Sequence, residues 1–108
     1  MKYVSKELLG LIGTEVMYWD FDAFTTSRSP ADQCDLLKED LVQVRMSATH
    51  ILDIGWYPSF DAEGRFKVLV IGDGDWESPS FHREATTWSG LRIAIKEALA
   101  TASSDATR

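Results

Sequence analysis

The chain has 108 residues, of which 44% are hydrophobic, and its 17 Asp and Glu against 11 Lys and Arg give a formal net charge of −6. This length fits one domain with its own core, and the hydrophobic fraction excludes an intrinsically disordered chain. The acidic balance argues against nucleic acid as a partner, because phosphate binding needs cations, and it suits a basic protein instead.

The expected compartment follows from three features of the sequence. No apolar run approaches the roughly 18 residues of a membrane-spanning helix. The first seven residues, MKYVSKE, lack the apolar core of a secretory signal. The lone cysteine, Cys34, cannot form an internal disulfide, which suits a reducing environment. We therefore expect a cytoplasmic protein with no membrane partner.

The first third of the chain predicts two short helices around an ambiguous segment. Ser5 can cap a helix that we expect to end at Gly13. Residues 14–24 are dense in β-formers and fit a strand, although a continued helix also fits them. The pair Ser29-Pro30 resembles an N-cap followed by proline at the first helical position, and predicts a helix that runs to about Glu39.

From position 41 the hydrophobic pattern changes to a period of two, which is typical of strands. Val42, Val44 and Met46 alternate with polar residues, and further strands are predicted at residues 50–57, 66–71 and 81–85. The turns between them are Asp61-Ala62-Glu63-Gly64, where we expect Gly64 to adopt positive φ, and Gly72-Asp73-Gly74-Asp75. Such short connections predict an antiparallel meander over about residues 41–86.

The last helix is predicted to begin after Thr87 and to pack on the sheet through Leu91, Ile95 and Leu99. The expected fold is therefore α+β: an antiparallel β-meander sheet of four to five strands, with an N-terminal helical segment and a C-terminal helix packed on one face. Residues 1–102 would form this single domain, and residues 103–108 a frayed tail.

The best metal candidate is an acidic turn. If Asp73 is position 1 of a calcium loop, acids fall at positions 1, 3 and 5, and Glu84 falls at position 12. However, Ser78 replaces the glycine needed at position 6, and strands are predicted where a calcium loop needs helices. The sequence therefore favours a solvated turn, and we expect no metal and no other cofactor.

A catalytic role is the minority interpretation. Cys34 lies beside Asp35, whose charge disfavours a reactive thiolate, and no nucleophile motif or phosphate loop is present. We therefore expect that the protein is not an enzyme. The alternatives are a small metal-dependent enzyme that uses Asp73, Asp75 or Glu84 with His82, and an adaptor subunit of a cytosolic assembly.

The turn after residue 72 also carries an aromatic residue where the core needs none. Trp76 lies between Asp75 and Glu77, and Trp is a frequent anchor of protein interfaces, whereas flanking acids would select a basic partner. Alternatively, Trp76 folds back onto the sheet edge. The predicted contact surface comprises Asp73, Asp75, Trp76 and Glu77, with Asp61 and Glu63 on the other turn as weaker candidates.

Four segments together resemble a bacterial family: LKEDLVQV at 37–44, LDIGWYP at 52–58, GRF at 64–66 and DWESP at 75–79. The family comprises immunity proteins of contact-dependent growth inhibition and related polymorphic toxin systems, and the resemblance covers roughly residues 37–80. It implies stoichiometric binding to a cognate toxin domain, expected to be a nuclease, encoded directly upstream. The motif contains no reactive group, so the resemblance transfers neither catalytic nor toxin-contact residues.

Overall fold

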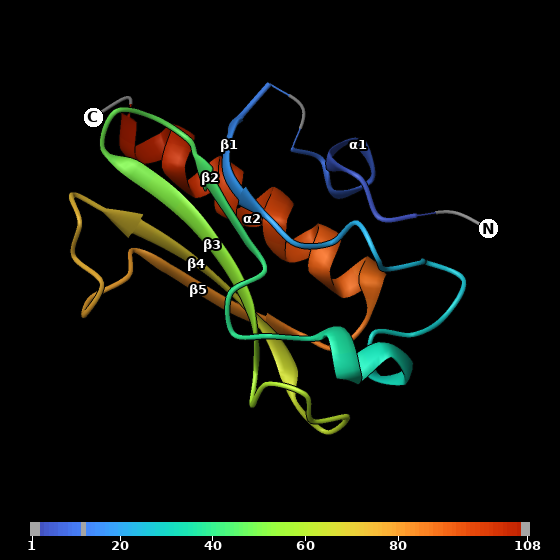
Figure 1. Cartoon of the computed structure of the whole chain (residues 1–108). Coiled ribbons are helices and arrows are strands. Elements are labelled where there is room, and N and C mark those ends of the chain that lie inside the picture. The colour runs from blue at the N-terminus through green and yellow to red at the C-terminus, as the bar shows by residue number, and fades with distance from the viewer. Residues whose placement is uncertain (1–2, 12, 107–108) are drawn as a thin grey trace.

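The computed structural model, which describes residues 3–11 and 13–106, is built on a five-stranded antiparallel sheet (Figure 1). The strands are adjacent in chain order, which confirms the predicted meander and the α+β class. In chain order the elements are α1 (Lys6–Leu9), β1 (Glu15–Trp19), the 3₁₀ helix η1 (Ala31–Leu36), β2 (Val42–Arg45), β3 (His50–Tyr57), β4 (Arg65–Gly72), β5 (Phe81–Ala85) and α2 (Trp88–Ala106).

The central pair of strands, β3 and β4, fixes the two faces of the sheet. They pair over their whole lengths, from His50 opposite Gly72 to Tyr57 opposite Arg65. Because side chains alternate across a strand, the even-numbered residues of both strands share one face. Six of these residues are fully buried: Leu52, Ile54, Trp56, Phe66, Val68 and Val70.

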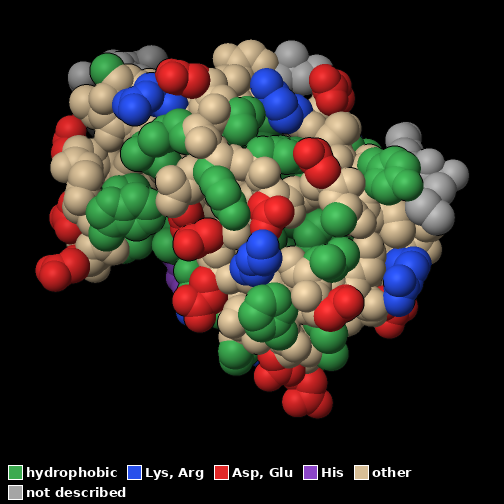
Figure 2. All heavy atoms as spheres, in the orientation of Figure 1, with side chains coloured by type: hydrophobic (Ala, Val, Ile, Leu, Met, Phe, Trp, Pro, Cys, Tyr) green, Lys and Arg blue, Asp and Glu red, His purple; other side chains and the backbone are tan. Residues whose placement is uncertain are grey.

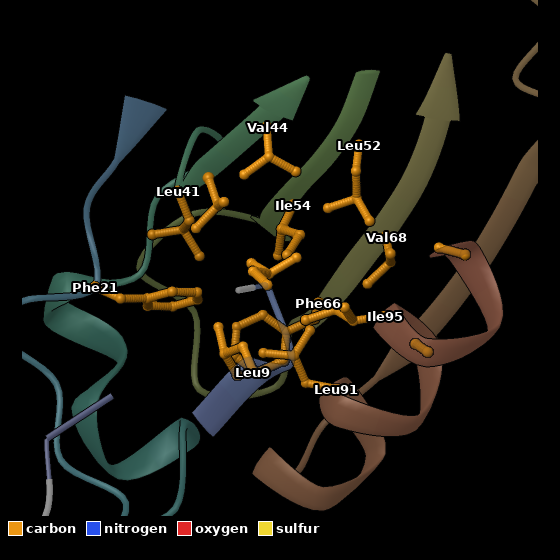
Figure 3. Close-up of a cluster of buried hydrophobic side chains, with 14 of the residues drawn as sticks. Leu9, Phe21, Leu41, Val44, Leu52, Ile54, Phe66, Val68, Leu91 and Ile95 are labelled. Atoms are coloured by element: carbon orange, nitrogen blue, oxygen red, sulfur yellow. The ribbon is translucent and has the colours of Figure 1, made fainter. Parts of the chain in front are cut away.

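The core lies between this face and α2 (Figure 3). Leu91 and Ile95 of α2 are fully buried, as predicted, whereas Leu99 is only partly buried. On the sheet side, the rings of Trp56 and Phe66 meet edge to face with their centroids 4.9 Å apart. α1 lies beside α2, and its Leu9 is buried in the same core.

The predicted ends of the two N-terminal helices were wrong. Ser5 caps α1 as predicted, since its Oγ accepts from the Leu8 N–H at 3.1 Å. The helix ends at Leu9 instead of near Gly13, because the C-cap residue Gly10 adopts a φ of 76°. The helix after Pro30 is 3₁₀ and ends at Leu36 instead of Glu39. The residues that follow Leu36 bond to β3 instead: the Lys38 carbonyl accepts from the Trp56 N–H at 2.8 Å.

The structure also resolves the ambiguous segment near the N-terminus and gives the extent of the last helix. The ambiguous residues 14–24 contain a strand, β1, which pairs with β2. α2 is helical to Ala106, in a segment where alanine is frequent and no glycine or proline follows Gly90. Residues 107–108 of the predicted tail lie outside the described residues. Among the described helices, none is long and apolar enough to cross a bilayer.

The glycine at the end of the β3–β4 turn serves close packing rather than positive φ. Phe60, with φ of 61°, is the residue in the left-handed region of this turn, and Gly64 is not. A Cβ on Gly64 would lie 2.5 Å from the Trp56 Nε1 and 2.8 Å from the Tyr57 carbonyl oxygen. The predicted conformational role was therefore wrong, and the residue is small because the chain passes against Trp56.

Candidate functional site

The loop of residues 73–80, which joins β4 to β5, begins with a tight turn. The Asp75 N–H donates to the Gly72 carbonyl at 3.1 Å, and the two central residues, Asp73 and Gly74, have φ values of 55° and 72°. Two positive φ values are what a type I′ turn requires, and Asp-Gly is a favoured pair for it. The turn fixes the start of the loop, and every residue from Asp73 to Ser80 is exposed.

Trp76 differs from the other three tryptophans in what its indole N–H contacts. The indole N–H groups of Trp19, Trp56 and Trp88 donate to Asp22, to the Asp61 carbonyl and to the Arg28 carbonyl, at 2.7 to 2.8 Å. Within residues 3–11 and 13–106, Trp76 has neither a hydrogen-bond acceptor for its indole nor a ring contact. Its side chain is 49% exposed and outside the core cluster. Trp76 is therefore a half-exposed side chain that belongs neither to the core cluster nor to the ring contacts of the core.

The acids of the loop have no cationic partner in the part of the chain that the structure describes. Asp73, Asp75 and Glu77 form no ion pair with any described residue, and residues 72–80 contain neither Lys nor Arg. Among the described residues, four acids elsewhere are paired with Lys or Arg, for example Glu84 with Arg65 at 3.1 Å. Acidic side chains are visible along the left edge of Figure 2, where Figure 1 places the loop. The loop is therefore a locally anionic protrusion with an aromatic side chain at its centre.

The second set of predicted residues lies at the opposite end of the sheet. Asp61 and Glu63 are in the β3–β4 turn, which β4 separates from the loop by eight residues, or about 25 Å of strand (Figure 1). The Asp61 Oδ1 accepts from the Glu63 N–H at 2.8 Å, and the Asp61 carbonyl holds the Trp56 indole. Asp61 therefore shapes its own turn, and the two turns do not form one patch.

The residues of the metal-dependent alternative are only partly brought together. His82 and Glu84 lie on β5, where His82 Nε2 is 3.4 Å from the Glu84 carboxylate and Arg65 holds the pKa of Glu84 below its usual value. In the strand register Glu84 lies opposite Lys67, which is several residues along β4 from the turn that holds Asp73 and Asp75. In the described part of the chain, no group of three or more His, Cys, Asp or Glu could hold a metal ion.

A buried acid on the face away from α2 was missed by the sequence analysis. Asp53 is 4% exposed and accepts a hydrogen bond from Gln43 Nε2 at 2.9 Å. Burial raises its pKa, although the hydrogen bond from Gln43 partly opposes that effect. On the same face, Lys67 Nζ lies 4.9 Å from the centre of the Tyr57 ring. The signal in the sequence was an acid in the middle of the apolar strand 50–57.

Comparison with known proteins gave no match, whether against protein-family models, curated proteins or solved structures. No residue role can therefore be transferred from a relative, and the interpretation of the site depends on the geometry of this chain.

Proposed function

We propose that this protein is an immunity protein that neutralises a cognate toxin domain by stoichiometric binding through the loop of residues 73–80. The observation that carries the proposed site is the exposed Trp76 indole, whose N–H has no acceptor in the described structure, between unpaired acids. Tryptophan is among the strongest interface anchors because it buries a large apolar area and offers one donor. Trp76 has both properties, and because it lies outside the core cluster its use in binding would not disturb the core.

The charge of the loop selects the kind of partner. Three unpaired carboxylates around one anchor complement a basic surface, which steers encounter and disfavours acidic competitors. Nucleic-acid-cleaving enzymes need cations to hold phosphates, so a basic nuclease domain fits this chemistry. The assignment to toxin immunity rests on the resemblance of residues 37–80, whereas the binding surface rests on the loop itself.

The function is tested by co-expression with the toxin domain encoded directly upstream of this protein's gene. We expect the wild-type chain to restore growth and to co-purify with the toxin at a 1:1 ratio. The quadruple variant with alanine at Asp73, Asp75, Trp76 and Glu77 should lose both effects. Tyr18→Ala is the matched control, since Tyr18 is another exposed aromatic residue (42%) but lies on β1.

Two failures of this experiment have different meanings. If the wild-type chain neither rescues growth nor forms a complex, toxin immunity is the wrong function. If the quadruple variant rescues growth as well as the wild type does, the immunity function stands and the loop is the wrong surface.

A further inference from the structure

A groove of about 420 Å³ lies between α1 and α2, on a part of the molecule that the proposed function does not use. Its floor includes the buried side chains of Leu9 and Ile95, and its walls include the partly buried Leu8 and Leu99. Ile93 also lines it and is 61% exposed. Ile93 lies outside the core cluster and adds an exposed apolar side chain to the lining of the groove.

Two cations at the groove lack partners. Arg92 and Lys96 line it from α2, and they are four residues apart, so they share one helix face, where like charges repel. Neither forms an ion pair within residues 3–11 and 13–106, whereas Lys38, Arg45 and Arg83 each do. Glu7 lines the groove from α1 and is not paired with either cation. The charged lining of the groove thus comprises two unpaired cations and one acid, a local excess of positive charge on an acidic protein.

We propose that this groove docks an amphipathic segment of a second protein, with apolar side chains against Ile93 and Leu99 and carboxylates on Arg92 and Lys96. The charge complementarity selects an acidic segment. A small ligand is a poorer fit, because such ligands need 70–90% or more of their surface buried, and the exposed Ile93 shows that the groove is open. A helix or extended segment needs contact along one side only.

The groove and the loop of residues 73–80 are separate surfaces with opposite preferences. Figure 1 shows the loop at the left edge of the molecule and α1 at the upper right. The loop has three unpaired acids and suits a basic partner, whereas the groove suits an acidic one. Both can therefore be occupied at once, and the groove proposal holds or fails independently of toxin immunity.

The test uses ¹⁵N-labelled protein and a designed peptide of about 16 residues, long enough for a docked helix. The peptide carries Leu at i, i+3, i+4 and i+7 and Glu beside them, and its twin carries Lys in place of Glu. We expect saturable amide shifts confined to residues 7–10 and 89–99, and binding of the Glu peptide at least about tenfold tighter than that of the twin. The Ile93→Ser variant should bind both peptides more weakly.

Charge reversal provides the decisive control. The double variant Arg92→Glu, Lys96→Glu changes two exposed residues and should prefer the Lys peptide, which a merely structural role would not produce. The matched control Arg45→Glu, an exposed cation on β2, should keep the wild-type preference. Shifts outside the groove, equal affinity for both peptides, or a preference unaffected by the reversal would overturn the proposal. A wild-type dimer in sedimentation that Ile93→Ser abolishes would also overturn it, in favour of a second copy of this chain.

Discussion

At the level of single residues, the four tryptophans differ in whether the fold uses their side chains or leaves them free to bind a partner. Trp56 is fully buried, and its indole fastens the β3–β4 turn through the Asp61 carbonyl. Trp19 and Trp88 are partly buried against the core and also have acceptors. Trp76 has neither kind of contact among the described residues. Its removal should therefore affect binding and leave folding almost unchanged.

Trp76→Ala is expected to weaken toxin binding by about 2 kcal/mol or more, because an anchor loses its buried area. Trp76→Phe should cost less, about 0.5–1.5 kcal/mol, because it mainly removes the N–H donor. The free energy of unfolding of both variants should stay within about 0.5 kcal/mol of the wild type. Titration calorimetry gives the affinities, and urea denaturation gives the stabilities. Loss of binding that is matched by loss of stability would make Trp76 a structural residue.

Asp53 predicts a pH effect of definite sign. Burial raises its folded-state pKa above that of the unfolded chain, so the folded state binds the proton more tightly. The contribution of Asp53 to stability therefore grows as pH falls through the folded pKa, and it declines as the carboxyl ionises. Asp53→Asn keeps an acceptor for Gln43 without the charge, so this variant should be more stable than the wild type at pH 7.

The advantage of Asp53→Asn should shrink as the pH falls through the folded-state pKa of Asp53, which burial raises above its usual value, because the wild-type carboxyl then becomes protonated. Urea denaturation of both proteins across this range measures the difference, in which shared effects such as the opposite contribution of Glu84 cancel. A constant difference at every pH would show that the charge of Asp53 is not the cause.

At the level of elements, the strands were predictable and the helix ends were not. The strands were predictable because their hydrophobic patterns follow burial. Val42 and Val44 alternate with polar residues in β2, and β4 is a nearly continuous apolar run. The 3₁₀ helix η1 ends early because the backbone after Leu36 bonds to β3, a tertiary contact that no local pattern contains. The loop of residues 73–80 was predictable as a turn because its sequence carries a local turn signal. The α1–α2 groove was not predictable, because it forms only when two distant segments pack together.

The packing of α2 gives a graded prediction. Ile95→Ala should lower the free energy of unfolding by about 2–5 kcal/mol, because Ile95 is fully buried against the sheet. Leu99 is only partly buried, so Leu99→Ala should cost less than Ile95→Ala. Urea denaturation of the two variants measures both values. A negligible cost for Ile95→Ala would contradict the docking of α2 on the core, and equal costs would contradict the predicted difference between Ile95 and Leu99.

The distribution of charge matters at the level of the whole molecule. The chain carries a net −6, yet its cations are partly paired within the sheet and partly gathered at the α1–α2 groove, so the loop of residues 73–80 stays anionic. A protrusion of one sign attracts an oppositely charged partner over about a Debye length, roughly 8 Å at physiological ionic strength.

The association rate with the toxin should therefore fall as salt rises, and the dissociation rate should change less. Neutralising Asp73, Asp75 and Glu77 while keeping Trp76 should lower the rate at low salt and flatten its salt dependence. Stopped-flow measurements of the change in tryptophan fluorescence on binding quantify both. A rate independent of salt in the wild-type protein would remove charge steering from the account.

The most direct test of the proposed function is the affinity of the purified chain for a toxin domain, which the proposal expects to be encoded directly upstream. Calorimetry compares the wild type with the Asp73, Asp75, Trp76 and Glu77 quadruple alanine variant. We predict a 1:1 complex of nanomolar affinity (about −12 kcal/mol) for the wild type and a loss of at least about 100-fold for the variant. No complex with the wild-type chain, or the same affinity for both proteins, would contradict the claim that this loop neutralises a toxin.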